Sequence, residues 1–270
     1  MAQTILYRKT LPYYNFLPYH NRSDGSESWQ WEFLRHAHMK GRCALGGNRI
    51  GKTEIGAYDS VMIVTGDHPW HKCPKNGVLW VVGLDNTMMA TVDRPMIDRY
   101  LPPWYKTHWN GQKQIWTCQY EDRYWEIHFK SSEMGQAKFQ GKKVDHVWMD
   151  EEIKKTDIWP EIKTRLVDNR GTWSITATPV KGTAWLKSIS EKPTYTTYGG
   201  MKENPYIPME EIEELALTLT ADEIDVRING KYMTFGGNPV FPGSEIRKML
   251  DRVKADKNYP EIGTITMEAA

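Results

Sequence analysis

The stretch Gly46-Gly47-Asn48-Arg49-Ile50-Gly51-Lys52-Thr53, hereafter the P-loop, decides the fold of this 270-residue chain. It matches the pattern G-x-x-x-x-G-K-[ST] at every fixed position. Its glycines let successive backbone N–H groups turn toward a phosphate, and the helix that starts at Gly51 points the positive end of its dipole at the same anion. Lys52 can reach the terminal phosphates, and Thr53 can ligate Mg²⁺. The P-loop therefore predicts a site for ATP and Mg²⁺.

The residues on either side of the P-loop have the periodicity that this motif requires. A short apolar stretch at 43–45 predicts a strand, and Ile55, Tyr58 and Met62 recur at helical spacing. Strand, glycine-rich turn and helix are the order in which a phosphate-binding loop is built.

Strands and helical segments alternate along the rest of the chain. Continuous apolar runs suit strands that are buried on both faces of a parallel sheet. The alternation predicts an α/β fold of the P-loop NTPase type (RecA-like, ASCE), a mainly parallel sheet flanked by helices, with a small lid-like subdomain. We predict strands at 77–84, 144–152, 173–179 and 194–199, a hairpin at 114–129, and helices at 28–39, 85–100 and 208–219.

The sequence pattern divides the chain into four parts. Residues 1–27 show no clear period and are predicted to form an irregular arm, and residues 28–185 the ATPase core. Residues 186–240 are predicted to form the lid or linker, and residues 241–270 a tail.

Two acidic residues follow the apolar strand at 144–152. In P-loop ATPases an Asp at this place, here Asp150, holds Mg²⁺, and the Glu after it, here Glu151, polarises the attacking water. The neighbouring Glu152 is the alternative base, and we favour Glu151. A solvated helix N-terminus, where acidic residues are common, is the competing interpretation.

A third motif, Thr176-Ala177-Thr178-Pro179, follows another buried strand. The hydroxyl groups of Thr176 and Thr178 can sense the terminal phosphate and transmit its loss to a moving element. A plain strand-to-loop turn ended by Pro179 is an equally good interpretation.

These motifs together resemble the large terminase subunits that package DNA in tailed double-stranded DNA bacteriophages. The resemblance rests on the position of each motif relative to the P-loop and covers about residues 28–241. It is carried by the P-loop and by the segments 29–33 (WQWEF), 65–69 (TGDHP), 150–152 (DEE), 176–179 (TATP), 203–208 (ENPYIP) and 237–241 (GNPVF).

The resemblance implies roles for residues that the spacing alone does not assign. Gln30 would contact adenine, and Arg49 would be an arginine finger that acts in cis on the γ-phosphate. Many relatives carry a trans-acting Arg where this chain has Gln140. Lys138, close to that position, and Arg165, which lies before a later strand, are therefore the candidates for a trans-acting residue.

The resemblance also implies a function and a set of partners. The chain would couple ATP hydrolysis to translocation of double-stranded DNA into a procapsid, in the cytoplasm of a bacterial host. Its partners would be DNA, the portal protein, a small terminase subunit and copies of itself in a ring. Full-length relatives continue into a nuclease domain, so we expect no nuclease activity from these 270 residues.

Two other functions remain open on the residues alone. A helicase-like DNA-dependent ATPase of another family would need a second motor lobe, for which the chain is too short. A nucleotide-binding clamp without turnover would not need the intact Glu151.

Composition limits these choices only weakly. A net charge of +1 neither requires nor excludes a nucleic-acid partner. The three cysteines are far apart in sequence, which argues against a disulfide framework and fits a reducing cytoplasm. No apolar run is long enough for a membrane span, so no membrane partner is expected.

His68, His71 and Cys73 form a loose H-x-x-H-x-C pattern that lacks a fourth ligand, and a solvated loop is expected there rather than a zinc site.

Overall fold

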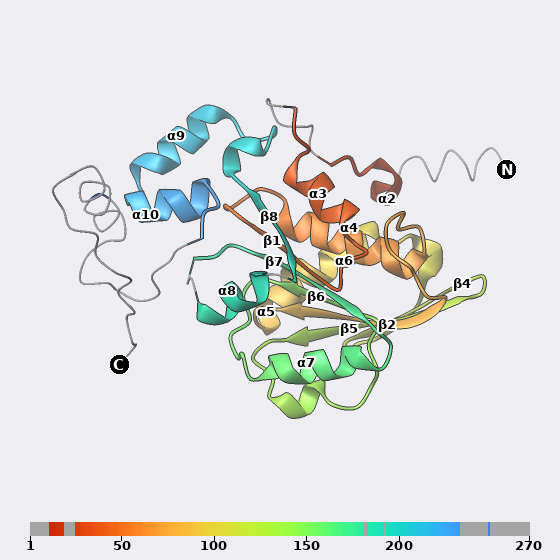
Figure 1. Ribbon diagram of the computed structural model, residues 1–270. Helices are drawn as coiled ribbons and strands as arrows, with labels where there is room; N and C mark the ends of the chain where they lie inside the picture. The colour runs from red at the N-terminus through yellow and green to blue at the C-terminus, as the bar shows by residue number, and fades with distance from the viewer. Residues whose placement is uncertain (1–10, 19–24, 181–182, 192, 233–247, 249–270) are drawn as a thin grey trace, which may run out of the picture.

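A computed structural model describes residues 11–18, 25–180, 183–191, 193–232 and 248 of the chain (Figure 1). Its strands form one eight-stranded sheet in the order β3-β4-β5-β2-β6-β7-β1-β8. In this order, the six strands from β5 to β8 pair in parallel with their neighbours. The pairs β3-β4 and β4-β5 are antiparallel. The predicted α/β fold with a mainly parallel sheet is confirmed. The strands are β1 (Gly41–Gly46), β2 (Asn76–Gly83), β3 (Lys106–Asn110), β4 (Ile115–Tyr120), β5 (Arg123–Ser131), β6 (His146–Asp150), β7 (Thr172–Ala177) and β8 (Tyr195–Gly199).

Helices cover both faces of the sheet (Figure 1). Helices α3, α4 and α6 lie on one face, and α7 and α8 lie on the other. The longer helices are α3 (Trp29–Arg35), α4 (Lys52–Thr65), α6 (Arg94–Tyr100), α7 (Ile158–Val167), α8 (Ala184–Ser190) and α9 (Met209–Leu217). The short ones are α2 (Pro12–Asn15), α5 (Asn86–Met88), η1 (Met89–Asp93), η2 (Pro103–Tyr105), η3 (Gln136–Phe139), η4 (Met201–Glu203), α10 (Ala221–Glu223) and η5 (Ile224–Ile228).

The sheet separates two hydrophobic cores, as its sequence pattern requires. Alternate residues of β2 point to opposite faces, so Leu79 and Val81 belong to the core under α4, and Trp80 and Val82 to the core under α7. A strand that is buried on both faces has no polar side and reads as a continuous apolar run. None of the helices in the described ranges is long and apolar enough to cross a lipid bilayer.

Several element boundaries differ from the prediction. The helix predicted at 28–39 ends at Arg35, although Ser28 does cap it, accepting a hydrogen bond from Trp31 N at 3.5 Å. The helix predicted at 85–100 contains a π-helical turn, η1. Strand β3 has no sequence signal, because it is a half-exposed edge strand without a run of β-branched residues.

The predicted division into parts also needs correction at two places. The boundary at 185/186 falls inside α8, and β8 after it pairs in parallel with β1, so the sheet extends beyond the predicted core. In the N-terminal arm, α2 is helical and buries Tyr13, whose hydroxyl bonds to Thr65 and Asp67 at 2.7 Å. The 237–241 segment, and all of the 241–270 tail but residue 248, lie outside the described residues.

A buried polar cluster lies between α4 and the amino ends of the strands. Arg42 donates two hydrogen bonds to Asp59, at 3.0 and 2.8 Å, and His68 Nε2 lies 2.9 Å from the same carboxyl group. Burial alone would raise the pKa of Asp59, but Arg42 and His68 hold that pKa well below its ordinary value. The carboxylate is therefore charged and fully paired.

The solvated loop expected at the H-x-x-H-x-C pattern is wrong for His68, which is buried against Asp59. His71 is half-buried and bonds through Nε2 to Thr172 Oγ1 at 3.0 Å. Burial lowers the pKa of His71 to about 4. No group of three or more His, Cys, Asp or Glu side chains in the described ranges has a metal-binding arrangement. The three cysteines are free. These histidines therefore hold the fold together.

The variant Asp59→Ala is expected to lower the free energy of unfolding by about 3–5 kcal/mol, because Arg42 would remain charged and buried without its partner. Urea denaturation followed by circular dichroism measures this change. Asp122→Ala is the matched control, since Asp122 forms its ion pair with Lys75 on the exposed surface and should matter little. Equal effects of the two variants would contradict the assignment.

Candidate functional site: the P-loop and the carboxyl ends of the central strands

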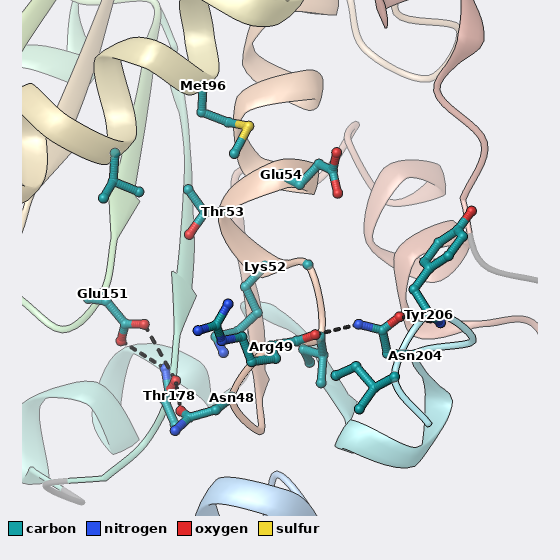
Figure 2. Close-up of a pocket in the computed structure, with 14 residues that line it drawn as sticks. Asn48, Arg49, Lys52, Thr53, Glu54, Met96, Glu151, Thr178, Asn204 and Tyr206 are labelled. Atoms are coloured by element: carbon teal, nitrogen blue, oxygen red, sulfur yellow. Dashed lines mark hydrogen bonds between the residues drawn. The ribbon is translucent and has the colours of Figure 1, made fainter. Parts of the chain in front are cut away.

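The site lies at the carboxyl ends of β1, β7 and β6, where the P-loop, Thr178 and Glu151 border one cavity of about 670 Å³. Figure 2 shows Glu151 and Thr178 at one end of this cavity and Asn204 and Tyr206 at the other, with the P-loop between them. The cavity is lined by Asn48, Arg49, Ile50, Gly51, Lys52, Thr53, Glu54, Val92, Met96, Glu151, Thr178, Asn204, Tyr206 and Ile207. Gly46 and Gly47 lie behind this lining and are buried.

The P-loop has the backbone shape that its glycines predict. Gly51 adopts a left-handed conformation, with φ of 79°, and α4 begins directly after it at Lys52. Because α4 starts here, its first N–H groups and the positive end of its dipole face the cavity. This end of α4 is therefore suited to bind an anion such as a phosphate group.

Lys52 is held close to the loop. Its Nζ donates a hydrogen bond to Gly47 O at 2.6 Å, and the side chain is buried. Burial lowers the pKa of Lys52, while the nearby carboxyl groups of Glu151 and Asp150 oppose that change. A buried ammonium group with one carbonyl partner retains donors for an incoming phosphate.

Two threonine hydroxyls hold the carboxyl group of Asp150. Thr53 Oγ1 donates to Oδ2 at 2.7 Å, and Thr176 Oγ1 donates to Oδ1 at 2.6 Å. Thr176 accepts in turn from the indole of Trp148 at 2.8 Å. These bonds fix Asp150 beside Thr53 at the start of α4, so the predicted coupling residue Thr176 contacts the acidic motif directly.

Glu151 has an unusual backbone. Its φ of 70° lies in the left-handed region, which non-glycine residues seldom adopt and which recurs at active sites. Its N–H donates to Thr176 O at 2.7 Å, and its carboxyl group turns into the cavity. Burial raises the pKa of Glu151, the positive charge of Lys52 opposes that change, and Asp150 adds to it.

Thr178 connects Glu151 to the P-loop. Its N–H donates to Glu151 Oε2 at 2.9 Å, and its hydroxyl lies 3.4 Å from Oε1 and 3.3 Å from Asn48 Oδ1 (Figure 2). A change at the phosphates can therefore reach β7 through these bonds. The neighbouring Glu152 points elsewhere, because its carboxyl group accepts from the hydroxyl of Thr183 at the start of α8.

Arg49 is exposed in the middle of the P-loop. It too has a left-handed backbone, with φ of 59°, and its carbonyl accepts a hydrogen bond from Asn204 Nδ2 at 2.6 Å. Within the part of the chain that the structure describes, its guanidinium group takes part in no ion pair. The side chain lines the cavity and remains available to a ligand.

The end of β8 and the segment after it contact the P-loop as well. Gly47 N donates to Gly199 O at 3.0 Å, and Asn48 N donates to Arg227 O at 2.7 Å. The sequence predicted a lid in this region but none of these bonds. No local pattern marks a backbone carbonyl as an acceptor for a distant loop.

The three remaining predicted site residues, Gln30, Lys138 and Arg165, do not line the P-loop cavity. Gln30 is buried at a second cavity of about 380 Å³, which shares Glu54 and Tyr206 with the first cavity. Lys138 is exposed and its carbonyl bonds to Lys130 of β5, four strand positions from β1, or ~19 Å at the usual strand spacing. It therefore lies too far away to act on the P-loop of its own chain.

Arg165 lies near the amino ends of the strands, opposite the end that carries the P-loop. Its carbonyl accepts from Val144 N at 3.1 Å, just before β6 begins, and its side chain pairs with Glu161 at 3.7 Å within α7. Lys138 lies near the carboxyl end of β5 and Arg165 near the amino end of β6, so only Lys138 is at the end of the sheet that carries the P-loop cavity.

One acidic residue of this region was missed by the sequence analysis. Asp93 ends the π-helical turn η1 and is fully buried next to Asp150. Burial raises the pKa of Asp93 to about 9, and the charge of Asp150 adds to that shift. Its position inside the helix predicted at 85–100 gave no sign that the side chain would be buried beside Asp150.

The donor set beside the P-loop fits Mg²⁺. This ion prefers hard oxygen ligands and usually keeps several waters, and it is commonly held by one or two carboxylates and by substrate phosphates. Asp150 and the hydroxyl of Thr53 stand together at 2.7 Å, and a second carboxyl group, that of Asp93, is adjacent. No nitrogen or sulfur ligand is present among them.

The fold and this arrangement define a P-loop NTPase of the RecA-like class. A family model described as the N-terminal part of the terminase large subunit, T4likevirus type, matches residues 43–233. The chain therefore belongs to the large terminase subunit family, as its motifs predicted. No curated protein matches it.

Solved structures agree with this fold. The ATPase domain of the Thermus phage P74-26 large terminase is 16% identical, with a TM-score of 0.63 over 76% of this chain and 93% of that domain. The large terminase of another thermophilic bacteriophage, in complex with ADP, is 16% identical, with a TM-score of 0.63 over 76% of this chain and 53% of that one. The bacteriophage HK97 large terminase is 13% identical, with a TM-score of 0.56 over 77% and 52%. The chain thus spans about half the length of the last two.

Proposed function

We propose that this chain is the ATPase motor domain of a phage large terminase, which couples Mg²⁺-dependent ATP hydrolysis to translocation of double-stranded DNA into a procapsid. The observation that carries the proposal is Glu151, whose left-handed backbone aims a carboxyl group across the cavity from the P-loop. A clamp without turnover would not need a strained residue at this place.

The residues divide the chemistry among them. The P-loop backbone and Lys52 bind the phosphates, and a phosphate oxygen replaces Gly47 O as the partner of Nζ. Glu151 accepts a proton from the attacking water. Bound Mg²⁺, held by Thr53 and Asp150, would neutralise the charge that develops on the phosphate oxygens.

The second cavity supports adenine binding by Gln30. It adjoins the phosphate cavity through Glu54 and Tyr206, so a nucleotide can extend from one cavity into the other. Arg49 acts on the γ-phosphate in cis, and Lys138 is the better candidate for a residue that reaches a neighbouring subunit.

Hydrolysis is transmitted to motion along two paths. Thr178 joins Glu151 to Asn48, and Thr176 joins Asp150 to β7. The bond from Asn48 N to Arg227 O moves the segment after β8, the lid, when the P-loop changes, and the bond from Gly47 N reaches Gly199 at the end of β8. The partners are double-stranded DNA, the portal protein, a small terminase subunit and other copies of the chain in a ring, in the cytoplasm of the host.

Phosphate release from ATP tests the proposal directly. Release should require Mg²⁺, stop with excess EDTA, and rise more than linearly with protein concentration if the ring completes each site. Procapsids and DNA, added together, should increase the rate and make the DNA resistant to nuclease. ATP binding without phosphate release, even with procapsids and DNA present, would instead support the clamp.

A further inference from the structure

Asp93 is a buried carboxyl group with no donor of its own. It is fully buried, and neither of its oxygens accepts a hydrogen bond from an N–H or O–H group of the described residues. Its polar neighbour is another acid, Asp150. A buried carboxyl group in this condition opposes folding, so its presence calls for a functional explanation.

The end of β2 leaves room for the carboxyl group of Asp93. Gly83 ends β2 and is the register partner of Asp150 in β6. A Cβ atom on Gly83 would lie 2.1 Å from Asp93 Oδ2, so the carboxyl group occupies the space that a side chain would fill there. Since neighbouring strands are ~4.8 Å apart, Asp93 stands beside Asp150 on the same face of the sheet.

The helical segment that carries Asp93 is also unusual. Residues Met89–Asp93 form a π-helical turn between α5 and α6, and such turns occur frequently at functional sites. Asp85 caps the start of this segment, accepting from Met88 N at 2.8 Å. Asp93 is the last residue of this turn and packs against Gly83 at the end of β2.

Two adjacent buried carboxyl groups avoid mutual repulsion either by sharing a proton or by binding a cation between them. The oxygens of Asp150 already have the hydroxyls of Thr53 and Thr176, whereas those of Asp93 have neither a hydroxyl nor an ammonium partner among the described residues. A hard divalent cation bound at Thr53 and Asp150 would satisfy both acids with one ion.

We propose that Asp93 is a further oxygen group of the Mg²⁺ site, which raises the affinity of the protein for the divalent cation together with Asp150 and Thr53. The inference rests on the proposed function, because it assumes that Mg²⁺ binds with ATP. It assigns to Asp93 a role in holding the cation, either directly or through the water molecules that Mg²⁺ retains.

Binding of Mn²⁺, measured by electron paramagnetic resonance with and without ATP, tests this assignment without relying on turnover. Asp93→Asn should raise the Mn²⁺ dissociation constant by ~10-fold or more, as expected for loss of a supporting oxygen. ATP binding in EDTA should be unchanged or tighter, because no cation then needs the carboxylate. A loss confined to fold stability would affect both measurements equally.

Asp98→Asn is the matched control, since Asp98 lies on α6 and pairs with Lys106 at the surface. Asp93→Ser is a second variant without a carboxyl group, and melting curves confirm that each variant is folded. Wild-type Mn²⁺ affinity in either folded Asp93 variant would overturn the inference. If the wild-type chain itself binds no Mn²⁺ with ATP, the proposed function fails instead.

Discussion

Glu151→Gln is expected to lower the rate of ATP hydrolysis by ~10³ while ATP binding is retained, because the amide cannot accept the proton of the attacking water. Gln is nearly isosteric and keeps an oxygen for the N–H of Thr178 at 2.9 Å. Single-turnover phosphate release measures the chemical step, and fluorescence titration with a labelled nucleotide measures binding.

Glu152→Gln is the control for this prediction. The two residues are adjacent in sequence, but Glu152 bonds to Thr183 and does not line the cavity. Its variant should keep hydrolysis within about tenfold of wild type, since no proton-transfer group is lost. If Glu152→Gln were the slower variant, the two acids would have to exchange roles.

Arg49→Ala is expected to lower hydrolysis by ~10³, the effect of removing an arginine finger. The guanidinium group lines the cavity, lies in the same loop as Lys52, and has no carboxylate partner in the described part of the chain. Arg170→Ala is a matched control, because Arg170 is also exposed with a left-handed backbone, at φ of 51°, but precedes the amino end of β7, away from the P-loop.

Mixing variants distinguishes a finger in cis from one in trans. Arg49→Ala chains retain Glu151, and Glu151→Gln chains retain Arg49. If Arg49 serves its own site, no subunit of a mixed ring has both groups, and the mixture stays inactive. Recovery of phosphate release on mixing would show that Arg49 reaches a neighbouring subunit, and the cis assignment would be wrong.

The central strands and the P-loop could be predicted because their signals are local. A strand that is buried on both faces is rich in apolar residues, so β2, β6 and β7 could be predicted from the chain alone. Strand β3 and the inward turn of η1 left no such signal. An edge strand has only half its surface in contact with the protein, and a π-helical turn has no distinct composition.

The cluster around Asp59 shows a second limit. The pattern of His68 and His71 was visible, but their burial was not, since it depends on Arg42 approaching from β1 and Thr172 from β7. Charged and polar residues are usually exposed, and only a partner from a distant segment reverses that expectation.

The sequence by itself determined the fold class, the family and the residue types proposed to bind phosphate and Mg²⁺, because a phosphate-binding loop is built from consecutive residues. The sequence favoured Glu151 over Glu152 but left both open, and the tertiary structure decided which acid faces the cavity. Glu151 and Glu152 are chemically equal in sequence, and the left-handed backbone of Glu151 separates them by sending one carboxyl group toward Thr178 and the other toward Thr183. It also brought Asp93 to Asp150 from a segment 57 residues earlier (150 − 93), since only the packing of η1 over Gly83 places the two acids together.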